Sequence, residues 1–303
     1  MGLLATAVRR WLLVVVWIPA PFTVGPALAT ALATVDRPVQ VVASVGCWLA
    51  WLVALVAMLV PCTVSLTTLR VVVPASVPAA GWSALAVAGP GWRGGLALST
   101  TTLATVVALS AATGDLHVNG SSYGEERRMP LRPPGVLLLG PVQLTWAAVV
   151  AGVVTGPLLL AARVWLAGAV ALAAGAGVAL VGVRALHVLA RRWVVFVPAG
   201  LVLVDPLTLT DALLAQRRVI AGLAPARADT TAQDLTAGAL GLALELRFTE
   251  PVTIVPRPAR HSPGGSGVTV VEVDAVLFSP TRPGAVLREA SRRRLTEGAQ
   301  RRP

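Results

Sequence analysis

Residues 39–64 read VQVVASVGCWLAWLVALVAMLVPCTV, an apolar run without a single charged side chain. About 20 apolar residues in a helix are enough to cross the hydrocarbon core of a bilayer. The run therefore predicts a transmembrane helix. It also sets the fold class, because five more apolar stretches lie before residue 187. Beyond that point the hydrophobic pattern changes, which indicates a separate C-terminal domain outside the membrane.

The six stretches predict an α-helical polytopic membrane domain over residues 1–190, with spans near residues 11–33, 39–64, 71–88, 96–112, 137–161 and 164–186. The first stretch follows Arg9 and Arg10 and could also be a cleaved signal peptide. Its length favours a retained helix, in which Pro19, Pro21 and Pro26 would produce kinks.

The last two spans predict a helical hairpin that turns at Arg163. Small residues recur in this hairpin at a spacing of four, at Gly152 and Gly156 and then at Ala171, Gly175 and Ala179. Such spacing lets helix backbones approach closely in lipid. In a chain so rich in alanine, chance could also produce the pattern.

The number of spans depends on residues 71–88, which contain Pro74 and Pro78, and on the hydroxyl-rich stretch 96–112. Arginines gather on the cytoplasmic side of membrane proteins. Six spans with a cytoplasmic N-terminus place nine arginines inside and three outside, whereas five spans put six on the wrong side. Four spans also satisfy the rule but leave an apolar segment of about 70 residues in the cytoplasm. We therefore predict six spans in the plasma membrane, with both termini cytoplasmic.

The net charge of +11 comes from 25 basic residues, all of them arginine. Twelve lie before Trp193, where they separate apolar runs, and the other 13 are offset by ten acidic residues. The C-terminal region is therefore only mildly basic, and the charge does not indicate nucleic-acid binding.

Polar side chains between the fourth and fifth spans gather in a loop over residues 114–134. We expect this loop to contact an anionic head group, a partner protein or the C-terminal domain through Tyr123, Glu125, Glu126, Arg127, Arg128 and Arg132. Alternatively, the loop is solvated and its arginines only fix the orientation of the chain. Asp115 and His117 lie two residues apart, but no further ligand completes a metal-binding set, so neither a metal nor another cofactor is expected.

Short strand patterns over residues 191–303 predict a small β-rich cytoplasmic domain. Leu244, Leu246 and Phe248 alternate with Glu245 and Arg247, as in a half-buried strand. A helix from Pro283 to about Leu295 closes the domain, and a turn is expected at 198–200. The expected strands are Trp193–Val197, Leu201–Val204, Leu207–Thr210, Arg218–Leu223, Leu240–Phe248, Val252–Val255 and Val268–Phe278.

The hairpin Trp193–Val204 and the closing helix resemble the pleckstrin-homology-like (PH-like) domains of some bacterial membrane proteins. This resemblance implies a rolled-up sheet of about seven strands that the C-terminal helix plugs at one end. The segments SYGEERR (122–128), RPPG (132–135), RWVVFVPAG (192–200) and SPTRPG (279–284) are also similar to those of a group of uncharacterised actinobacterial polytopic membrane proteins, a similarity that implies no function.

The basic C-terminal segment is expected to lie at the lipid surface, with Arg288, Arg292, Arg293 and Arg294 attracted to anionic lipids of the inner leaflet. Alternatively, the segment is a solvated terminus without a binding role.

Three functions are compatible with these observations. The first is a non-enzymatic scaffold or interaction module, in which the spans anchor a cytoplasmic β domain that binds a protein partner through residues 193–303. The second is a small-solute transporter or lipid-handling protein, although the spans contain no carboxylate at mid-membrane. The third is an enzyme that acts on a membrane substrate with Asp115, His117, Glu125 and Glu126. We expect the first and assign no catalytic residue.

Overall fold

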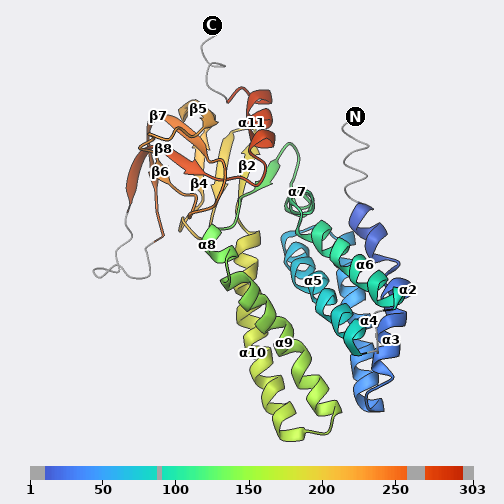
Figure 1. The fold of residues 1–303 in the computed structure, drawn as a ribbon. Helices are drawn as coiled ribbons and strands as arrows, with labels where there is room; N and C mark the ends of the chain where they lie inside the picture. Colours follow the sequence, from blue (N-terminus) through green and yellow to red (C-terminus); the bar gives the residue numbers. More distant parts are fainter. Residues whose placement is uncertain (1–10, 87–90, 258–269, 296–303) are drawn as a thin grey trace. The chain divides into compact units, whose positions relative to one another are not determined.

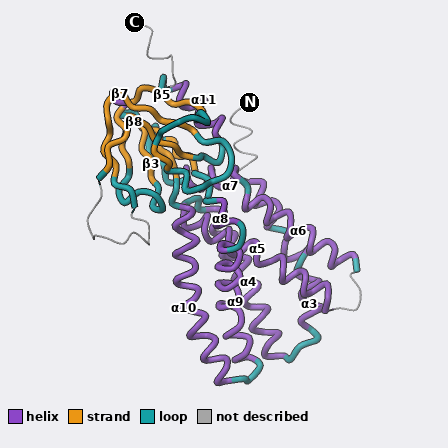
Figure 2. The backbone as a smooth tube through the Cα atoms, turned by 60° about the vertical axis from the view of Figure 1, so that its left-hand side comes forward, coloured by secondary structure: helices purple, strands orange, loops and turns teal. Residues whose placement is uncertain are grey.

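The computed structural model describes residues 11–86, 91–257 and 270–295, which form two compact units. The helical unit comprises residues 1–120 and 143–187, and the β unit comprises residues 121–142 and 188–303. In Figure 2 the strands all lie in the β unit, and the long helices form the helical unit. This division differs from the expected boundary at residues 190 and 191, because residues 121–142 lie between two helices in sequence but belong to the β unit.

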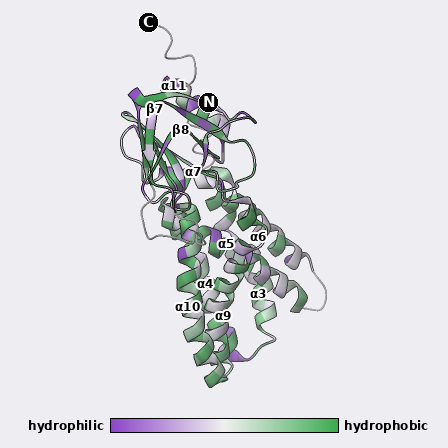
Figure 3. Cartoon of the chain, turned by 90° about the vertical axis from the view of Figure 1, so that its left-hand side faces the viewer, coloured by the Kyte–Doolittle hydropathy of each residue, from purple (hydrophilic) through white to green (hydrophobic). Residues whose placement is uncertain are grey.

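Five helical stretches of the described residues are long and apolar enough to cross a membrane. They are Trp11–Leu32, α4 (Arg37–Leu59), α5 (Thr63–Ala86), α9 (Pro141–Ala161) and α10 (Trp165–Ala190). Figure 3 shows hydrophobic residues along most of α9 and α10. A sixth crossing results if α6 (Trp92–Leu109) and α7 (Ala111–Asn119), which are bent by 54°, count as one span. The chain is therefore compatible with a multi-pass membrane protein.

Prolines act differently in two of these stretches. The first stretch is broken at residues 18–19 and at Val24 into a helical piece over residues 11–17, α2 (Ala20–Thr23) and α3 (Gly25–Leu32), as its prolines predict. In α5, by contrast, Pro74 and Pro78 lie inside a continuous helix.

The expected start of the third span at residue 71 is wrong, since α5 begins at Thr63. The expected second span, 39–64, is correspondingly too long, because α4 ends at Leu59. The polar residues at the start of α5 gave it low hydropathy. Their hydroxyl groups, however, bond within the helix: Thr67 donates to the Thr63 carbonyl at 3.1 Å and Thr68 to the Val64 carbonyl at 3.1 Å.

Residues 114–119 do not belong to a loop, contrary to expectation, because they form most of helix α7. The Ser110 hydroxyl caps this helix by accepting a hydrogen bond from the Thr113 N–H at 3.3 Å. At the other end of α7, Gly120 lies so close to Pro61 that an added Cβ would overlap the Pro61 carbonyl. The end of α7 therefore lies at the turn between α4 and α5.

Helices α9 and α10 form the predicted hairpin, which turns at Arg163 with a φ of +63°. A Cβ on Gly175 would overlap the carbonyl oxygen of Gly152, and a Cβ on Gly156 would lie 2.6 Å from the Cα of Leu172. The glycines at a spacing of four thus mark the close approach of the two backbones, a packing that is common between membrane helices.

The core of the helical unit is built mainly from alanine and other small side chains. Ala54, Ala57, Ala104 and Ala108 are buried in one cluster. Next to it, the indole N–H groups of Trp17 and Trp51 each donate to the other's backbone carbonyl, at 3.0 and 3.2 Å. The first helical stretch is therefore held against α4.

The β unit contains two four-stranded sheets (Figure 1). The first sheet is antiparallel in the order β1-β2-β3-β4 and comprises β1 (Arg127–Pro130), β2 (Trp193–Val197), β3 (Gly200–Val204) and β4 (Leu213–Gln216). The second has the order β5-β7-β8-β6, with β6 parallel to β8, and comprises β5 (Ile220–Pro225), β6 (Gln233–Asp234), β7 (Leu244–Ile254) and β8 (Val271–Phe278).

The strand predictions had mixed outcomes. The hairpin of β2 and β3 and its turn are confirmed. The strand expected over Leu207–Thr210 is wrong, because the Asp205 carbonyl accepts hydrogen bonds from the Thr208 and Leu209 N–H groups and turns the chain. Strand β4 was missed, because Leu214 is exposed and hides its alternation. The two strands expected at 240–248 and 252–255 are one strand, β7, with a bulge between Arg247 and Val252, and residues 268–269 lie outside the described residues.

One hydrophobic core joins both sheets to α11 (Pro283–Arg292), which confirms the predicted closing helix. Phe196, Leu246 and Phe278 contribute from the strands, and Val286 and Ala290 contribute from α11. Met129 of β1 is buried in the same core, so the segment that precedes α9 in sequence is an integral part of the β unit.

Candidate functional site

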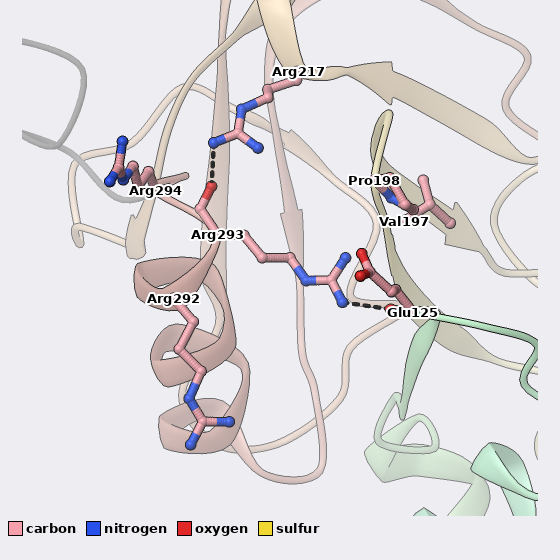
Figure 4. A pocket seen from close by; sticks show the side chains of 7 residues that line it. All are labelled: Glu125, Val197, Pro198, Arg217, Arg292, Arg293 and Arg294. Atoms are coloured by element: carbon pink, nitrogen blue, oxygen red, sulfur yellow. Dashed lines mark hydrogen bonds between the residues drawn. The ribbon is translucent and has the colours of Figure 1, made fainter.

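A cleft of about 590 Å³ lies in the β unit at the C-terminal end of α11 (Figure 4). The loop before β1, the end of β2, the short 3₁₀ helix η1 (Arg217–Val219) and the last turn of α11 form its walls. The cleft is lined by Glu125, Val197, Pro198, Arg217, Arg292, Arg293 and Arg294. Four of these seven residues are arginines, so the cleft has a strongly positive lining.

Arg293 is the most rigidly held of these arginines. Its Nε donates to the Glu289 carboxylate at 2.8 Å, and one terminal nitrogen donates to the Glu125 carbonyl at 2.5 Å. The guanidinium also lies 5.9 Å from the centre of the Phe196 ring, within cation–π range. Contacts to three different elements therefore fix its position between α11 and the loop before β1.

Arg217 approaches the cleft from the opposite wall. One of its terminal nitrogens donates to the backbone carbonyl of Arg293 at 2.6 Å. The last carbonyls of a helix have no partner within the helix and carry the negative end of its dipole, so an arginine stabilises them. Arg217 thus links η1 to the end of α11.

Arg292 and Arg294 are exposed and less constrained. The Arg292 side chain is 78% exposed and lies 3.5 Å from a Glu289 oxygen. Arg294 has a φ of +55° and turns the chain after α11, so that the N–H of Leu295 reaches the Ala290 carbonyl at 2.8 Å. In Figure 4 both side chains point away from Arg293. The arginines therefore spread over a surface and do not converge on one point, an arrangement that suits an extended anionic partner.

The structure brings Glu125 of the predicted loop site together with Arg292, Arg293 and Arg294 of the predicted lipid-surface site. Among the remaining predicted residues, Tyr123 is 88% exposed and does not line the cleft. Glu126 and Arg128 form an ion pair at 3.1 Å. Arg127 begins β1 opposite Phe196, and Arg288 lies exposed on α11.

Arg132 contacts the C-terminal domain, one of the three alternatives expected for the predicted loop, and Arg192 is a buried residue of the β unit. Arg192 is 1% exposed and forms two hydrogen bonds of 2.7 Å with the Asp205 carboxylate. It also donates to the Arg132 carbonyl at 2.7 Å, while the Arg132 side chain donates to the Leu240 carbonyl at 2.7 Å. These bonds hold the segment after β1 to the rest of the β unit. Arg192 should therefore not be counted among the arginines that orient the chain in a membrane.

The residues of the enzyme hypothesis are divided between the two units. Asp115 and His117 lie in α7 of the helical unit, whereas Glu125 and Glu126 lie in the β unit. His117 is buried, and its two ring nitrogens lie 2.9 Å from the Thr113 carbonyl and 3.3 Å from the Ala57 carbonyl. In the part of the chain that the structure describes, no group of three His, Cys, Asp or Glu side chains could hold a metal ion.

Glu245 is the one predicted outward-facing strand residue that the structure buries, at 5% exposure. Burial alone would raise the pKa of this carboxyl, but hydrogen bonds from Arg247 and Thr230 and the Arg247 charge outweigh it, so the pKa is lowered. The Arg247 Nε lies 2.6 Å from the carboxylate. Glu245 is therefore a charged, paired residue, and it does not line the cleft.

Sequence reasoning missed Arg217, which follows β4 and lies 76 residues before Arg293, whose carbonyl it binds. No local pattern connects these two segments, and only the folded β unit places them together. No protein-family model matches the chain, and neither a curated protein nor a solved structure is similar to it.

Proposed function

We propose that the chain is a non-enzymatic, multi-pass membrane protein that carries the β unit on the cytoplasmic side as an interaction module. In this proposal the arginine cleft binds anionic head groups of the inner leaflet. The observation that supports it most strongly is the cleft itself, where Arg293 is held rigidly and the exposed guanidinium groups of Arg292 and Arg294 are available for phosphates. The PH-like resemblance and a protein partner on residues 193–303 belong to the same proposal.

Six membrane crossings are the count that fits the helical unit best. Gly120 ends α7 against Pro61, so α6 and α7 together run from the end of α5 back to the turn between α4 and α5. The Trp146 indole donates to the Val71 carbonyl at 3.0 Å, and His187 lies 2.8 Å from the Thr67 hydroxyl. The start of α9 and the end of α10 therefore lie at the same end of the unit as Pro61.

The covalent chain keeps the cleft near the membrane for any arrangement of the two units. Only five residues separate Gly120, at the end of α7, from Glu125, whose carbonyl binds Arg293. A fully extended chain of that length spans about 18 Å at most. The exposed arginines of the cleft thus remain within reach of head groups, where each attracts anionic lipid by about 1 kcal/mol.

The topology can be tested with the two natural cysteines. Cys62 lies in the turn before α5, and hydrogen bonds from Ser65 lower the pKa of its thiol, which favours the reactive thiolate. We expect a membrane-impermeant maleimide to label Cys62 only from the cytoplasmic side. A single cysteine at Arg163→Cys, in a cysteine-free background, should be labelled only from the opposite side, and Cys47 within α4 from neither. Labelling of Cys62 and Arg163→Cys from the same side would refute the six-span proposal.

Head-group binding can be tested by hydrogen–deuterium exchange of the full chain in lipid nanodiscs. With anionic phosphatidylglycerol present, we expect slower exchange in η1 and the last turn of α11 than in neutral discs, and the difference should disappear in high salt. The double variant Arg292→Gln/Arg294→Gln should lose this protection, because about 2 kcal/mol of attraction is removed.

Arg227→Gln is the matched control, because Arg227 is 71% exposed in an ion pair and lies outside the cleft. This variant should keep the protection. Equal protection in neutral and anionic discs, or an equal loss in Arg227→Gln, would contradict the proposed role of the cleft.

A further inference from the structure

Arg70 is a charged residue inside a membrane-spanning helix. In sequence it lies between the predicted spans 39–64 and 71–88, but the structure places it two turns inside α5. It follows Thr63, the first residue of the helix, by seven positions. Ionisable side chains within spans are rare, because their transfer into hydrocarbon is costly, and they usually mark a functional site.

Among the described residues, Arg70 has no carboxylate partner. Across the ranges that the structure describes, no hydrogen bond or ion pair involves the Arg70 guanidinium. Arg192, in contrast, forms two hydrogen bonds with the Asp205 carboxylate. A charged guanidinium without a carboxylate in this position requires an anion from outside the protein or contact with the membrane surface.

Polar groups surround Arg70 on neighbouring helices. One turn earlier on the same face of α5, the Thr67 hydroxyl meets His187 of α10 at 2.8 Å. On another side, the Arg70 charge lies close enough to the His117 ring of α7 to act on it electrostatically. Both ring nitrogens of His117 already face backbone carbonyls, so this ring supplies no anion. Arg70 thus lies on the part of α5 that meets α7 and α10.

The depth of Arg70 identifies the source of the anion. Seven residues of helix place its Cα about 10 Å from the start of α5, and α5 is about 36 Å long against a hydrocarbon core of about 30 Å. The Cα therefore lies roughly 7 Å below the head groups. A long arginine side chain extends back toward the interface over such a distance. The anions at that level are the phosphates of the lipids themselves.

We propose that Arg70 forms a phosphate-binding site for one phospholipid, between α5, α7 and α10 at the Pro61 end of the helical unit. The planar guanidinium binds the phosphate oxygens in pairs, and the neighbouring helices confine the head group. The site depends on the chain being in a membrane, but it is independent of the arginine cleft in the β unit.

Native mass spectrometry of the full chain, purified in a mild detergent, tests this site. We expect one phospholipid to remain bound to the wild-type protein and to be lost from Arg70→Gln, with a rise in dissociation constant of about tenfold to hundredfold. Arg70→Lys should bind with intermediate strength, because it keeps the charge but loses the paired hydrogen bonds. Arg163→Gln, at the opposite turn between α9 and α10, is the control and should retain the lipid.

A second measurement separates binding from folding. Because Arg70 has no partner among the described residues, the delipidated Arg70→Gln protein should unfold at the same temperature as the delipidated wild type or above it. A lower temperature would show that Arg70 is structural and would overturn the proposal, as would equal lipid retention in Arg70→Gln and the wild type.

The source of the phosphate can be tested separately. A short-chain phospholipid should raise the unfolding temperature of the delipidated wild-type protein, and inorganic phosphate at the same concentration should not. An equal, Arg70-dependent rise with inorganic phosphate would support a phosphate site but overturn a lipid as its source. If Arg292→Gln/Arg294→Gln kept its protection in nanodiscs, the proposed role of the cleft would be wrong. The result for lipid binding at Arg70 would not change.

Discussion

Replacing Asp205 with alanine is expected to destabilise the β unit by about 3–5 kcal/mol. The Asp205 carboxylate is the only described anionic partner of Arg192, and both side chains are at most 1% exposed. Removal of the carboxylate leaves a charged guanidinium buried without compensation. The backbone N–H of Leu207 also loses its 3.0 Å hydrogen bond to Asp205. The region around β2, β3 and the segment after β1 should therefore open first.

Hydrogen–deuterium exchange of the full chain measures this effect locally. We expect faster exchange in β2 and β3 of the Asp205→Ala variant, while α9 and α10 remain unchanged. The double variant Arg192→Met/Asp205→Leu should recover part of the lost stability, because it removes the buried charge, but the Arg132 carbonyl then lacks its donor.

Asp229→Ala is the matched control for this prediction. It breaks another arginine–aspartate pair, Arg227–Asp229, in which the side chains are 71% and 74% exposed. Exposed pairs contribute little to stability, so no change in exchange is expected. If Asp229→Ala accelerated exchange as much as Asp205→Ala, burial would not determine how much the Arg192–Asp205 pair contributes to stability.

Replacing Gly175 with alanine is expected to destabilise the hairpin of α9 and α10 by about 1–3 kcal/mol. Within a helix, replacing glycine with alanine by itself stabilises the helix by about 1 kcal/mol. Helix propensity therefore opposes the destabilisation that we expect. The packing outweighs it, because the new methyl group would overlap the carbonyl oxygen of Gly152 on α9. The two helices would have to move apart along their closest contact.

Gly177→Ala tests whether this loss comes from the contact between the helices. Gly177 lies two residues further along α10, and a Cβ there would meet no atom within 4 Å. We expect this variant to be as stable as the wild type or slightly more stable. Titration with SDS, followed by far-ultraviolet circular dichroism, compares the two variants. If Gly175→Ala resisted SDS as well as Gly177→Ala does, the close packing of α9 on α10 would be refuted.

Several features of the protein follow from local sequence. The apolar runs predict the long helices, because the free energy of burying a helix in lipid depends on composition over about 20 residues. The hairpin of β2 and β3 and the helix α11 were also predictable, since a short turn and a starting proline define them locally. The glycine spacing in α9 and α10 predicted their close approach, and the structure confirms it.

Other features depend on contacts between distant residues. Strand β1 contains two arginines and a proline, which locally indicate a loop, and it becomes a strand only because β2 offers an unpaired edge 66 residues later. At the start of α5, the Thr67 hydroxyl lies 2.8 Å from His187, a residue 120 positions later in the sequence. The residues next to Arg192 in sequence do not indicate a buried ion pair. Those next to Arg217 do not indicate the wall of a cleft.

Long apolar helices compatible with a membrane and a separate β-rich region can be read from consecutive residues alone, because hydrophobicity and its period are local properties of the chain. The folded chain, in contrast, assigns residues 121–142 to the β unit and brings Glu125 to the arginines of α11. It also buries Arg192 against Asp205, whereas Arg70 has no carboxylate partner among the described residues. The physical reason is that the environment of a charged side chain is set by its neighbours in space. In this chain those neighbours come from segments that lie up to about 170 residues apart in sequence.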